Sequence, residues 1–238
     1  CVIAEIRSGR KAVSEFAWLR APRAQRSIWS GRGRKTMATA IVGVAEHGNS
    51  AELVTVAVEG GEGVLLDRRR VDLTENLPTH PYHHEGAWAV GRYRDSDWSR
   101  DITLDEAIAL VEQVTTAAAE GASRSLASLA IELPVEIKRI AIRVCAELPE
   151  SIEARIRDNR AQTMADSIMY RLALADAADA RGWTVVWYDK KQVFEAAAAV
   201  LGRDDVDAVL KVMGKVAGTP WQARHKLAAA AALAAAAS

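Results

Sequence analysis

The sequence predicts an α/β domain built on a five-stranded mixed sheet, in which three antiparallel strands are followed by two parallel strands and helices flank the sheet. Three neighbouring runs are rich in Val, Ile and Leu and are separated by short turn sequences, at Thr39–Ala45, Ala51–Glu59 and Gly63–Val71. This pattern is typical of an antiparallel meander. Helical and short apolar segments then alternate along the chain, which indicates parallel strands connected by helices.

The amino-acid composition limits the classes of protein to which this chain can belong. Half of the 238 residues are hydrophobic, which is enough for one sizeable core. Residues 1–36 hold nine basic and two acidic residues, so the rest of the chain holds 22 basic against 29 acidic ones. An acidic balance argues against broad, non-specific binding to nucleic acid. The only cysteines are Cys1 and Cys145, and the longest apolar run is too short to span a membrane. We therefore expect a cytoplasmic protein without membrane contact.

The basic residues 1–36 form a segment of their own, in which Pro22 and the pair Gly31 and Gly33 interrupt any helix. We expect no packed element there. It can be a basic arm that reaches nucleic acid, a targeting peptide, or a non-native extension before a start at Met37. We favour the extension, because Cys1 stands in place of an initiator. A single domain would then cover residues 37–238.

A long loop with aromatic anchors is predicted at residues 72–101, after the meander. Its segment His80-Pro-Tyr-His-His-Glu85 contains residue types that bind zinc. The spacing of His80, His83 and His84 is not a familiar zinc spacing, and no cysteine lies nearby. We expect these histidines to be solvated or stacked on aromatic rings, without stoichiometric metal.

The remaining elements follow from capping and spacing signals. Thr103-Leu-Asp-Glu106 is a capping box, and it begins a helix that we expect to end at Gly121. The last helix is apolar nearly all round, so we expect it to be either buried or frayed. The other predicted elements are a strand at Leu126–Leu133, a helix at Val135–Ala146, a helix at Thr163–Ala180, a strand at Thr184–Tyr188, and helices at Gln192–Leu201, Asp205–Val216 and Trp221–Ala237.

Glu132 is the first candidate for a functional residue. It lies at the predicted end of an inner strand, directly before Leu133 and Pro134. Ligands of open α/β sheets bind at the carboxyl ends of the strands, so a carboxylate there is a site candidate by position. The alternative is an ordinary solvated glutamate at the end of a strand.

From about Thr39 to Ala237 the chain resembles the ribonuclease-H-like superfamily, and within it the RuvC group of Holliday-junction resolvases. The group opens with a strand that reads apolar-apolar-Gly-apolar-Asp, and its fourth strand reads apolar-Ala-Ile-Glu. The segments that carry the resemblance are Ile41-Val-Gly-Val-Ala-Glu-His-Gly48, Leu129-Ala-Ile-Glu132, Lys190-Lys-Gln-Val193 with the helix Gly202–Val216, and Ala223-Arg-His-Lys-Leu-Ala-Ala-Ala-Ala231.

The resemblance implies a metal-dependent endonuclease that acts on structured DNA or RNA with two Mg²⁺ or Mn²⁺ ions. It assigns the metal ions to Glu46, Glu132 and His225. It also assigns Lys190 and Lys191 to the scissile phosphate, so that the catalytic residues would be these lysines with Glu132 and His225.

The acidic motif of the group is incomplete in this chain. Ala45 stands where the first strand should carry an aspartate, and Ala228 stands where the last helix should carry one. Glu46 is one residue late, so it faces the wrong side of the sheet unless the strand contains a bulge. Two function classes therefore stay open: a divergent nuclease, and a catalytically degenerate ligand-binding or scaffold protein on the same fold. A homodimer is a further expectation.

Overall fold

The computed structural model describes residues 39–237, and the predictions for residues 1–36 lie outside this range. One five-stranded mixed sheet organises the fold, with strand order β3-β2-β1-β4-β5. β1 and β3 each pair antiparallel with β2, whereas β4 pairs parallel with both β1 and β5. This is the predicted ribonuclease-H-like sheet. The strands are β1 (Thr39–His47), β2 (Ser50–Glu59), β3 (Glu62–Asp72), β4 (Glu136–Arg143) and β5 (Thr184–Tyr188).

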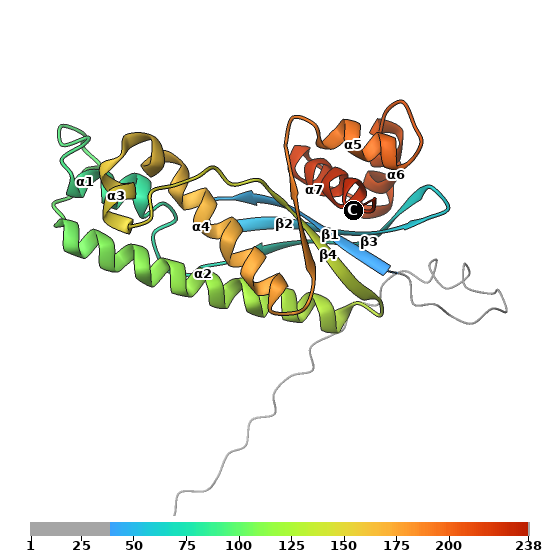
Figure 1. Cartoon of the computed structure of the whole chain (residues 1–238), viewed down its shortest axis with the longest axis horizontal. Coiled ribbons are helices and arrows are strands. Elements are labelled where there is room, and N and C mark those ends of the chain that lie inside the picture. The colour runs from blue at the N-terminus through green and yellow to red at the C-terminus, as the bar shows by residue number, and fades with distance from the viewer. Residues whose placement is uncertain (1–38, 238) are drawn as a thin grey trace, which may run out of the picture. The chain divides into compact units, whose positions relative to one another are not determined.

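Helices cover both faces of the sheet (Figure 1). One face packs against α2 (Leu104–Glu132) and α4 (Asn159–Asp179). The other face packs against α5 (Val193–Val200), α6 (Asp207–Ala217) and α7 (Ala223–Ala234). Three short elements lie near the start of α4: η2 (Tyr82–Gly86), which is a π-helical turn, α1 (Ala87–Ala89) and α3 (Ile152–Arg157).

Strand alternation divides the buried residues into two cores. In β1, Val42 and Val44 face α2 and α4, whereas Ile41 and Ala45 face the α7 side. This is the two-residue period expected of a strand that is buried on both faces. No helix within residues 39–237 is long and apolar enough to cross a membrane.

The alanine-rich helix α7 is buried, which confirms the first of the two alternatives, buried or frayed, that the sequence predicts for it. All of its residues from Ala228 to Leu233 are fully buried. The helix crosses β1 at Gly43, where a Cβ atom would overlap with the backbone carbonyl of Ala228. Small side chains on both elements therefore allow the helix and the strand to approach backbone to backbone.

The predicted helix end at Gly121 and the predicted strand Leu126–Leu133 are both wrong, because α2 continues to Glu132. Gly121 is needed for packing and does not cap the helix: a Cβ there would overlap with the carbonyl of Leu73. The buried positions Ala118, Ala122, Leu126 and Leu129 keep helical spacing through the glycine. The helix ends before Pro134, which disfavours helical backbone at Leu133.

The predicted helix Val135–Ala146 is also wrong, because this segment contains β4. A bulge explains the error. Ala40 and Ile41 of β1 pair with Ile137 and Arg139 of β4, which leaves Lys138 as an extra residue. Ile137 and Ile140 consequently face the same core at a spacing of three residues, which imitates the period of a helix.

The other predicted elements are confirmed to within a few residues. Thr103 caps α2, with its side chain accepting from the backbone N–H of Glu106 and the Glu106 carboxylate accepting from the backbone N–H of Thr103. The predicted strand Thr184–Tyr188 is β5. The loop at residues 72–101 contains the short helical elements η2 and α1.

Replacement of Gly121 by alanine tests the close contact of α2 with Leu73. In an ordinary helix interior this change stabilises the fold by up to about 1 kcal/mol. Here we expect a loss of about 1–3 kcal/mol in the free energy of unfolding, because the added methyl group overpacks the contact. Chemical denaturation measures the change, and Ala119→Gly at an exposed position of α2 gives the ordinary propensity effect for comparison. A more stable Gly121→Ala protein would contradict the contact.

Candidate functional site

The carboxyl ends of β1 and β4 lie side by side and form the edge of the sheet where α/β proteins bind ligands. Within the sheet, β2 and β3 lie on one side of β1, and β4 and β5 lie on its other side. Glu46 is near the end of β1, and Arg143 is the last residue of β4. These two residues mark the candidate site, which we call the carboxyl edge.

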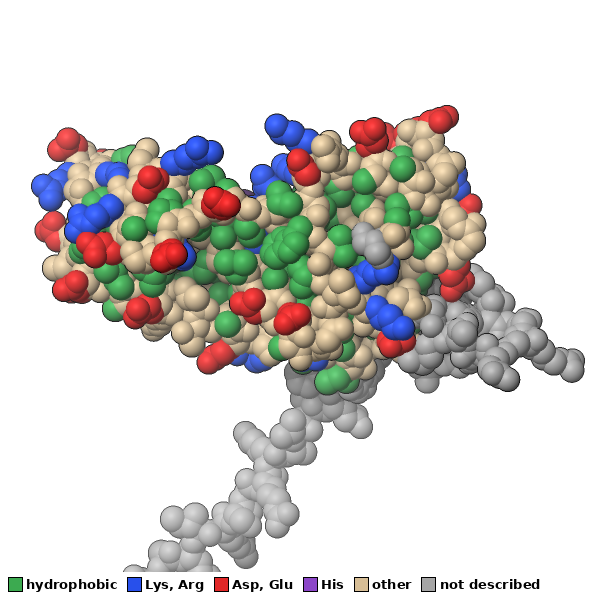
Figure 2. Space-filling model, viewed as in Figure 1, with side chains coloured by type: hydrophobic (Ala, Val, Ile, Leu, Met, Phe, Trp, Pro, Cys, Tyr) green, Lys and Arg blue, Asp and Glu red, His purple; other side chains and the backbone are tan. Residues whose placement is uncertain are grey.

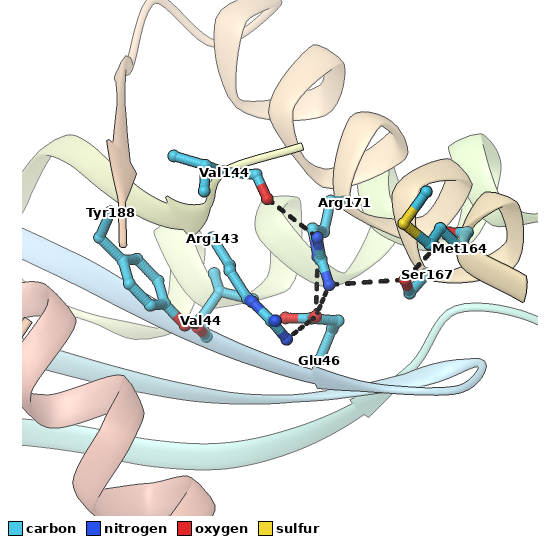
Figure 3. Close-up of polar contacts among 8 residues, drawn as sticks. All are labelled: Val44, Glu46, Arg143, Val144, Met164, Ser167, Arg171 and Tyr188. Atoms are coloured by element: carbon cyan, nitrogen blue, oxygen red, sulfur yellow. Dashed lines mark hydrogen bonds and ion pairs between the residues drawn. The ribbon is translucent and has the colours of Figure 1, made fainter. Parts of the chain in front are cut away.

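A buried ion pair occupies the carboxyl edge (Figure 3). Oε1 of Glu46 accepts a hydrogen bond from Nε of Arg171 at 2.7 Å and lies 2.5 Å from Nη2 of the same residue. Both side chains are only 7% exposed. Arg171 also donates from Nη1 to the carbonyl of Val144 at 3.0 Å, and its Nη2 lies 3.5 Å from Oγ of Ser167. One guanidinium group thus joins β1, α4 and the segment after β4.

Arg143 brings a second positive charge to the same carboxylate. Its Nη1 lies 3.9 Å from Oε1 of Glu46, and its side chain is 42% exposed. Behind the cluster, the Tyr188 hydroxyl donates to the carbonyl of Val44 at 2.8 Å. Burial raises the pKa of Tyr188, which keeps this hydroxyl protonated as a donor. Glu46 with two arginines leaves the carboxyl edge with a net charge of about +1.

Arg143 also stands where the family pattern carries its acid. The pattern apolar-Ala-Ile-Glu fits the chain at Leu129-Ala-Ile-Glu132, but this segment is helical. The strand at the matching place in the sheet is β4, which reads Ile140-Ala-Ile-Arg143. The Ala-Ile pair therefore occurs twice, and the copy in the strand ends in arginine. This second occurrence is the signal that could have identified Arg143 from the sequence.

Glu132 lies at the end of α2 and away from the carboxyl edge. Its Oε2 is 3.0 Å from Nη1 of Arg69 on β3, and it also accepts a hydrogen bond from Ser128. These contacts, that of Ser128 first, lower the pKa of Glu132. Since β3 is two strands from β1, Arg69 is separated from β1 by roughly 10 Å across the sheet. Glu132 lines a groove of about 550 Å³ between β3 and α2, with Arg69, Arg70, Arg124 and Ser125.

His225 lies on the opposite face of the sheet from Glu46. Its Nε2 is 3.2 Å from Oε2 of Glu52, and its Nδ1 accepts a hydrogen bond from the backbone N–H of Gln222 at 2.9 Å. Trp221 stacks on the imidazole at 5.7 Å between ring centroids. Both ring nitrogens therefore have partners within the chain, and neither is free to bind a metal ion.

No bulge turns Glu46 towards His225. The pairing of β1 with β2 is regular from Ala40 to His47, with Ala45 opposite Glu52. Successive side chains of β1 consequently point to opposite faces. Ala45 faces the α7 side, whereas Glu46 faces α4 and contacts Arg171.

The predicted metal ligands do not fit a two-metal site, because Glu46, Glu132 and His225 lie in three separate places. Within residues 39–237 no group of three or more His, Cys, Asp or Glu side chains is arranged to hold a metal ion. Lys190 and Lys191 follow β5 and are exposed, and the backbone N–H of Lys191 donates to Asp189. The catalytic roles of both lysines stay predictions.

The histidines of the long loop lie in an aromatic cluster beside the start of α4. The ring centroids of His80 and His83 are 5.5 and 5.4 Å from that of His84, which in turn stacks on Trp88 at 6.1 Å. The buried carboxylate of Asp166 on α4 accepts hydrogen bonds from the backbone N–H groups of Tyr82 and His83, at 2.9 and 3.0 Å. Burial raises the pKa of Asp166 to about 7 and lowers the pKa values of His80 and His83.

No family model matches this sequence, and no curated protein matches it. Among solved structures, the chain is similar to RuvC of T. thermophilus in complex with a Holliday junction substrate, with 16% identity over 83% of this chain and 92% of that chain and a TM-score of 0.49. A second Thermus thermophilus RuvC structure gives 14% identity over 83% and 93%, with a TM-score of 0.45. The yeast mitochondrial Holliday junction resolvase gives 12% over 84% and 77%, with a TM-score of 0.38. The predicted resemblance is confirmed, and at these identities it concerns the fold alone.

Removal of the Arg171 guanidinium should strongly destabilise the fold. Arg171→Met leaves the Glu46 carboxylate buried with only Arg143 near it, so we expect a loss of about 3–5 kcal/mol in the free energy of unfolding. The double variant Glu46→Gln/Arg171→Met should be more stable than Arg171→Met alone, because no uncompensated charge is then buried. Urea denaturation measures the free energy of unfolding of the wild type and of both variants. Arg157→Met removes an exposed pair with Glu153, whose side chains are 59% and 51% exposed, and should cost at most about 1 kcal/mol; equal losses at Arg171 and Arg157 would contradict the assignment.

Asp166 should make stability depend on pH near neutrality. Its folded pKa of about 7 is above the ordinary value of 3.8, so its contribution to stability is fully present below that ordinary value and is lost as pH rises through 7. His80 and His83 have the opposite effect, but only below their ordinary value of 6.5. Between about pH 8 and about pH 6.5 we therefore expect the wild type to gain stability on acidification. Asp166→Asn should lack this gain in denaturation curves, and an identical pH profile in both proteins would exclude the assignment.

Proposed function

We propose that this chain is a ribonuclease-H-like protein that binds structured DNA or RNA without metal-dependent cleavage. The observation that carries the proposal is the buried ion pair of Glu46 with Arg171 at the carboxyl edge, with Arg143 beside it. The guanidinium groups of Arg171 and Arg143 supply the positive charge beside the Glu46 carboxylate, where a metal ion would otherwise have to supply it.

The chemistry of the donor set supports the absence of metal-dependent hydrolysis. Mg²⁺ requires oxygen ligands in near-octahedral geometry, and a two-metal mechanism requires ligands that surround two ions roughly 3.5–4 Å apart. A metal ion at Glu46 would have to displace Arg171 from a pair whose side chains are 7% exposed. Glu132 and His225 have other partners, at Arg69 and Glu52, and do not complete the ligand set.

The cations at the carboxyl edge support binding of an anionic polymer. Arg143 is half exposed, and Lys190 and Lys191 are exposed just beyond the end of β5, which is parallel to β4 and ends at the same edge of the sheet. Lys and Arg side chains at one edge can contact successive phosphates. The acidic balance of the chain from Met37 onward favours a local contact of this kind over a broad one.

The alternative is a divergent endonuclease that uses Mg²⁺ or Mn²⁺ with Glu46, Glu132 and His225 as ligands and Lys190 or Lys191 at the phosphate. The placement of Glu46 at the end of β1 favours it. For activity, Glu46 would have to exchange Arg171 for metal ions, and the other two ligands would have to move across the sheet. The same experiment discriminates between the two functions.

The test uses a labelled four-way DNA junction and an RNA–DNA hybrid, with and without Mg²⁺ or Mn²⁺. We expect salt-dependent binding and no cleavage product in any condition. The double variant Lys190→Ala/Lys191→Ala should bind about tenfold more weakly and show a salt slope smaller by about 2. Lys211→Ala/Lys215→Ala on α6 removes the same charge from exposed positions elsewhere and should bind like wild type. Equal affinities of all three proteins would contradict binding at the carboxyl edge.

Cleavage has its own control. Metal-dependent cleavage by the wild type that disappears in Glu46→Gln or Glu132→Gln would establish the nuclease alternative and overturn the proposal. On the proposed function, Glu132→Gln retains the stability and the nucleic-acid affinity of the wild type, because this exposed carboxylate pairs only at the surface.

A further inference from the structure

Aromatic side chains of the loop at residues 72–101 reach the surface of the molecule. Trp98 is 49% exposed and Tyr93 is 43% exposed, and their ring centroids lie 5.3 Å apart with the ring planes tilted by 39°. Half-buried His84 and Trp88 support Trp98, and the centroid of each ring lies 5.7 Å from that of Trp98. We call these four residues the aromatic platform. It presents two rings to solvent on a packed base.

The backbone of Tyr93 adopts a conformation that disfavours a large side chain. Its φ is 58°, in the left-handed region, where Gly and Asn are the usual residues. Strained positions of this kind cluster at sites that bind ligands. Because a smaller residue would relieve the strain, the presence of a tyrosine ring beside Trp98 favours a role for the ring itself.

The aromatic platform is connected to the carboxyl edge through the turn between β1 and β2. A Cβ atom on Gly48 of this turn would lie 2.7 Å from Cγ2 of Thr79 and 3.5 Å from Cε1 of His80. The ring of His80 in turn lies 5.5 Å from that of His84, which belongs to the platform. The platform therefore lies beyond the carboxyl end of β1, on the side where Figure 1 draws α1 and α3.

Helix α4 forms a second connection between the platform and the carboxyl edge. Near its start, the carboxylate of Asp166 accepts a hydrogen bond from the backbone N–H of His83 at 3.0 Å. Five residues farther along the helix, Arg171 binds Glu46 at the carboxyl edge. Five residues of α-helix correspond to about 7.5 Å. One nucleic-acid strand can therefore contact the cations of the carboxyl edge and continue to the platform.

The platform differs from the carboxyl edge in charge. Residues 91–101 hold three arginines and three aspartates, so this segment has no net charge. Side chains of both signs cover the end of the molecule where Figure 1 places α1 and α3 (Figure 2). Phosphate binding is favoured by a positive balance, whereas every nucleobase has a π-face that can stack on Trp or Tyr. The platform is therefore suited to bases rather than to phosphates.

We propose that the aromatic platform stacks unpaired bases of a nucleic acid whose phosphates are bound at the carboxyl edge. The proposal rests on the proposed function, and it narrows the substrate class to structures that contain a single-stranded segment. Bases within a duplex are stacked on each other, and removing one from the stack costs free energy, so unpaired bases are the favoured ligands. Trp98 and Tyr93 provide the two exposed rings. Stacking of this kind tolerates every base.

The first experiment compares the binding of two single strands of equal length, oligothymidylate and an abasic strand, to the full chain. Both strands carry the same phosphates, so a difference in affinity reports the bases. We expect the wild type to bind oligothymidylate more tightly, by about fivefold or more. Trp98→Leu keeps an apolar side chain without a ring and should abolish this preference, whereas Trp98→Phe should retain it. Equal affinity of the wild type for both strands, or an unchanged preference in Trp98→Leu, would overturn the proposal.

Tyr93→Gly separates stacking from a structural role of the ring. Glycine adopts the φ of Tyr93 without strain, so we expect the variant to fold with a melting temperature close to that of the wild type. Its preference for oligothymidylate over the abasic strand should nevertheless fall by about twofold or more. An undiminished preference in this variant contradicts stacking on the pair of rings.

A fully paired four-way junction distinguishes failure of this proposal from failure of the proposed function. The junction offers phosphates but no unpaired base, so Trp98→Leu should bind it like the wild type and with the same salt slope. Lys190→Ala/Lys191→Ala should weaken binding of the junction and of both single strands. Absence of junction binding by the wild type would contradict the proposed function, whereas the ratio of the affinities for the two single strands decides the role of the platform by itself. A Trp98→Leu protein that loses as much affinity for the junction as for oligothymidylate also excludes stacking of unpaired bases.

Discussion

The ion pair of Glu46 and Arg171 is the constraint on which the arrangement at the carboxyl edge depends. A carboxylate that is 7% exposed is stable only with a compensating charge and hydrogen bonds, and Arg171 supplies both. The same guanidinium binds the carbonyl of Val144. Arg171 thus ties α4 to the ends of two parallel strands, in addition to the apolar core that α4 shares with the sheet.

The close backbone packing of α7 against β1 is a second constraint on the fold. α7 crosses β1 where Gly43 has no side chain, and Ala228 is fully buried at that crossing. An aspartate at Ala228 would bring a charged side chain into a fully buried position. An alanine at this position is therefore compatible with the tight contact of α7 with β1. Burial of apolar area by the alanines holds α7 in place.

Local signals predicted most elements, and their failures have local physical causes. The clean alternation of β2 and the capping box at Thr103 are short-range patterns, so they could be identified from the sequence. Gly121 was misinterpreted because its packing partner, Leu73, is distant in the sequence. The bulge at Lys138 depends on pairing with β1 and leaves no local trace. In the site, Glu46 was identified, but its partner Arg171 lies 125 residues away and no motif connects the two.

The arginines at the carboxyl edge have a simple electrostatic role beside Glu46. Clustered carboxylates repel one another unless a cation is bound, so a site built from them depends on the supply of metal. A guanidinium group is covalently attached, always charged, and shaped to bind a carboxylate with two donors. With Arg143 at the end of β4 and Arg171 on Glu46, two guanidinium groups face one carboxylate at this edge. On the proposed function, such an edge attracts the phosphates of a nucleic acid without a bound metal ion to activate water against them.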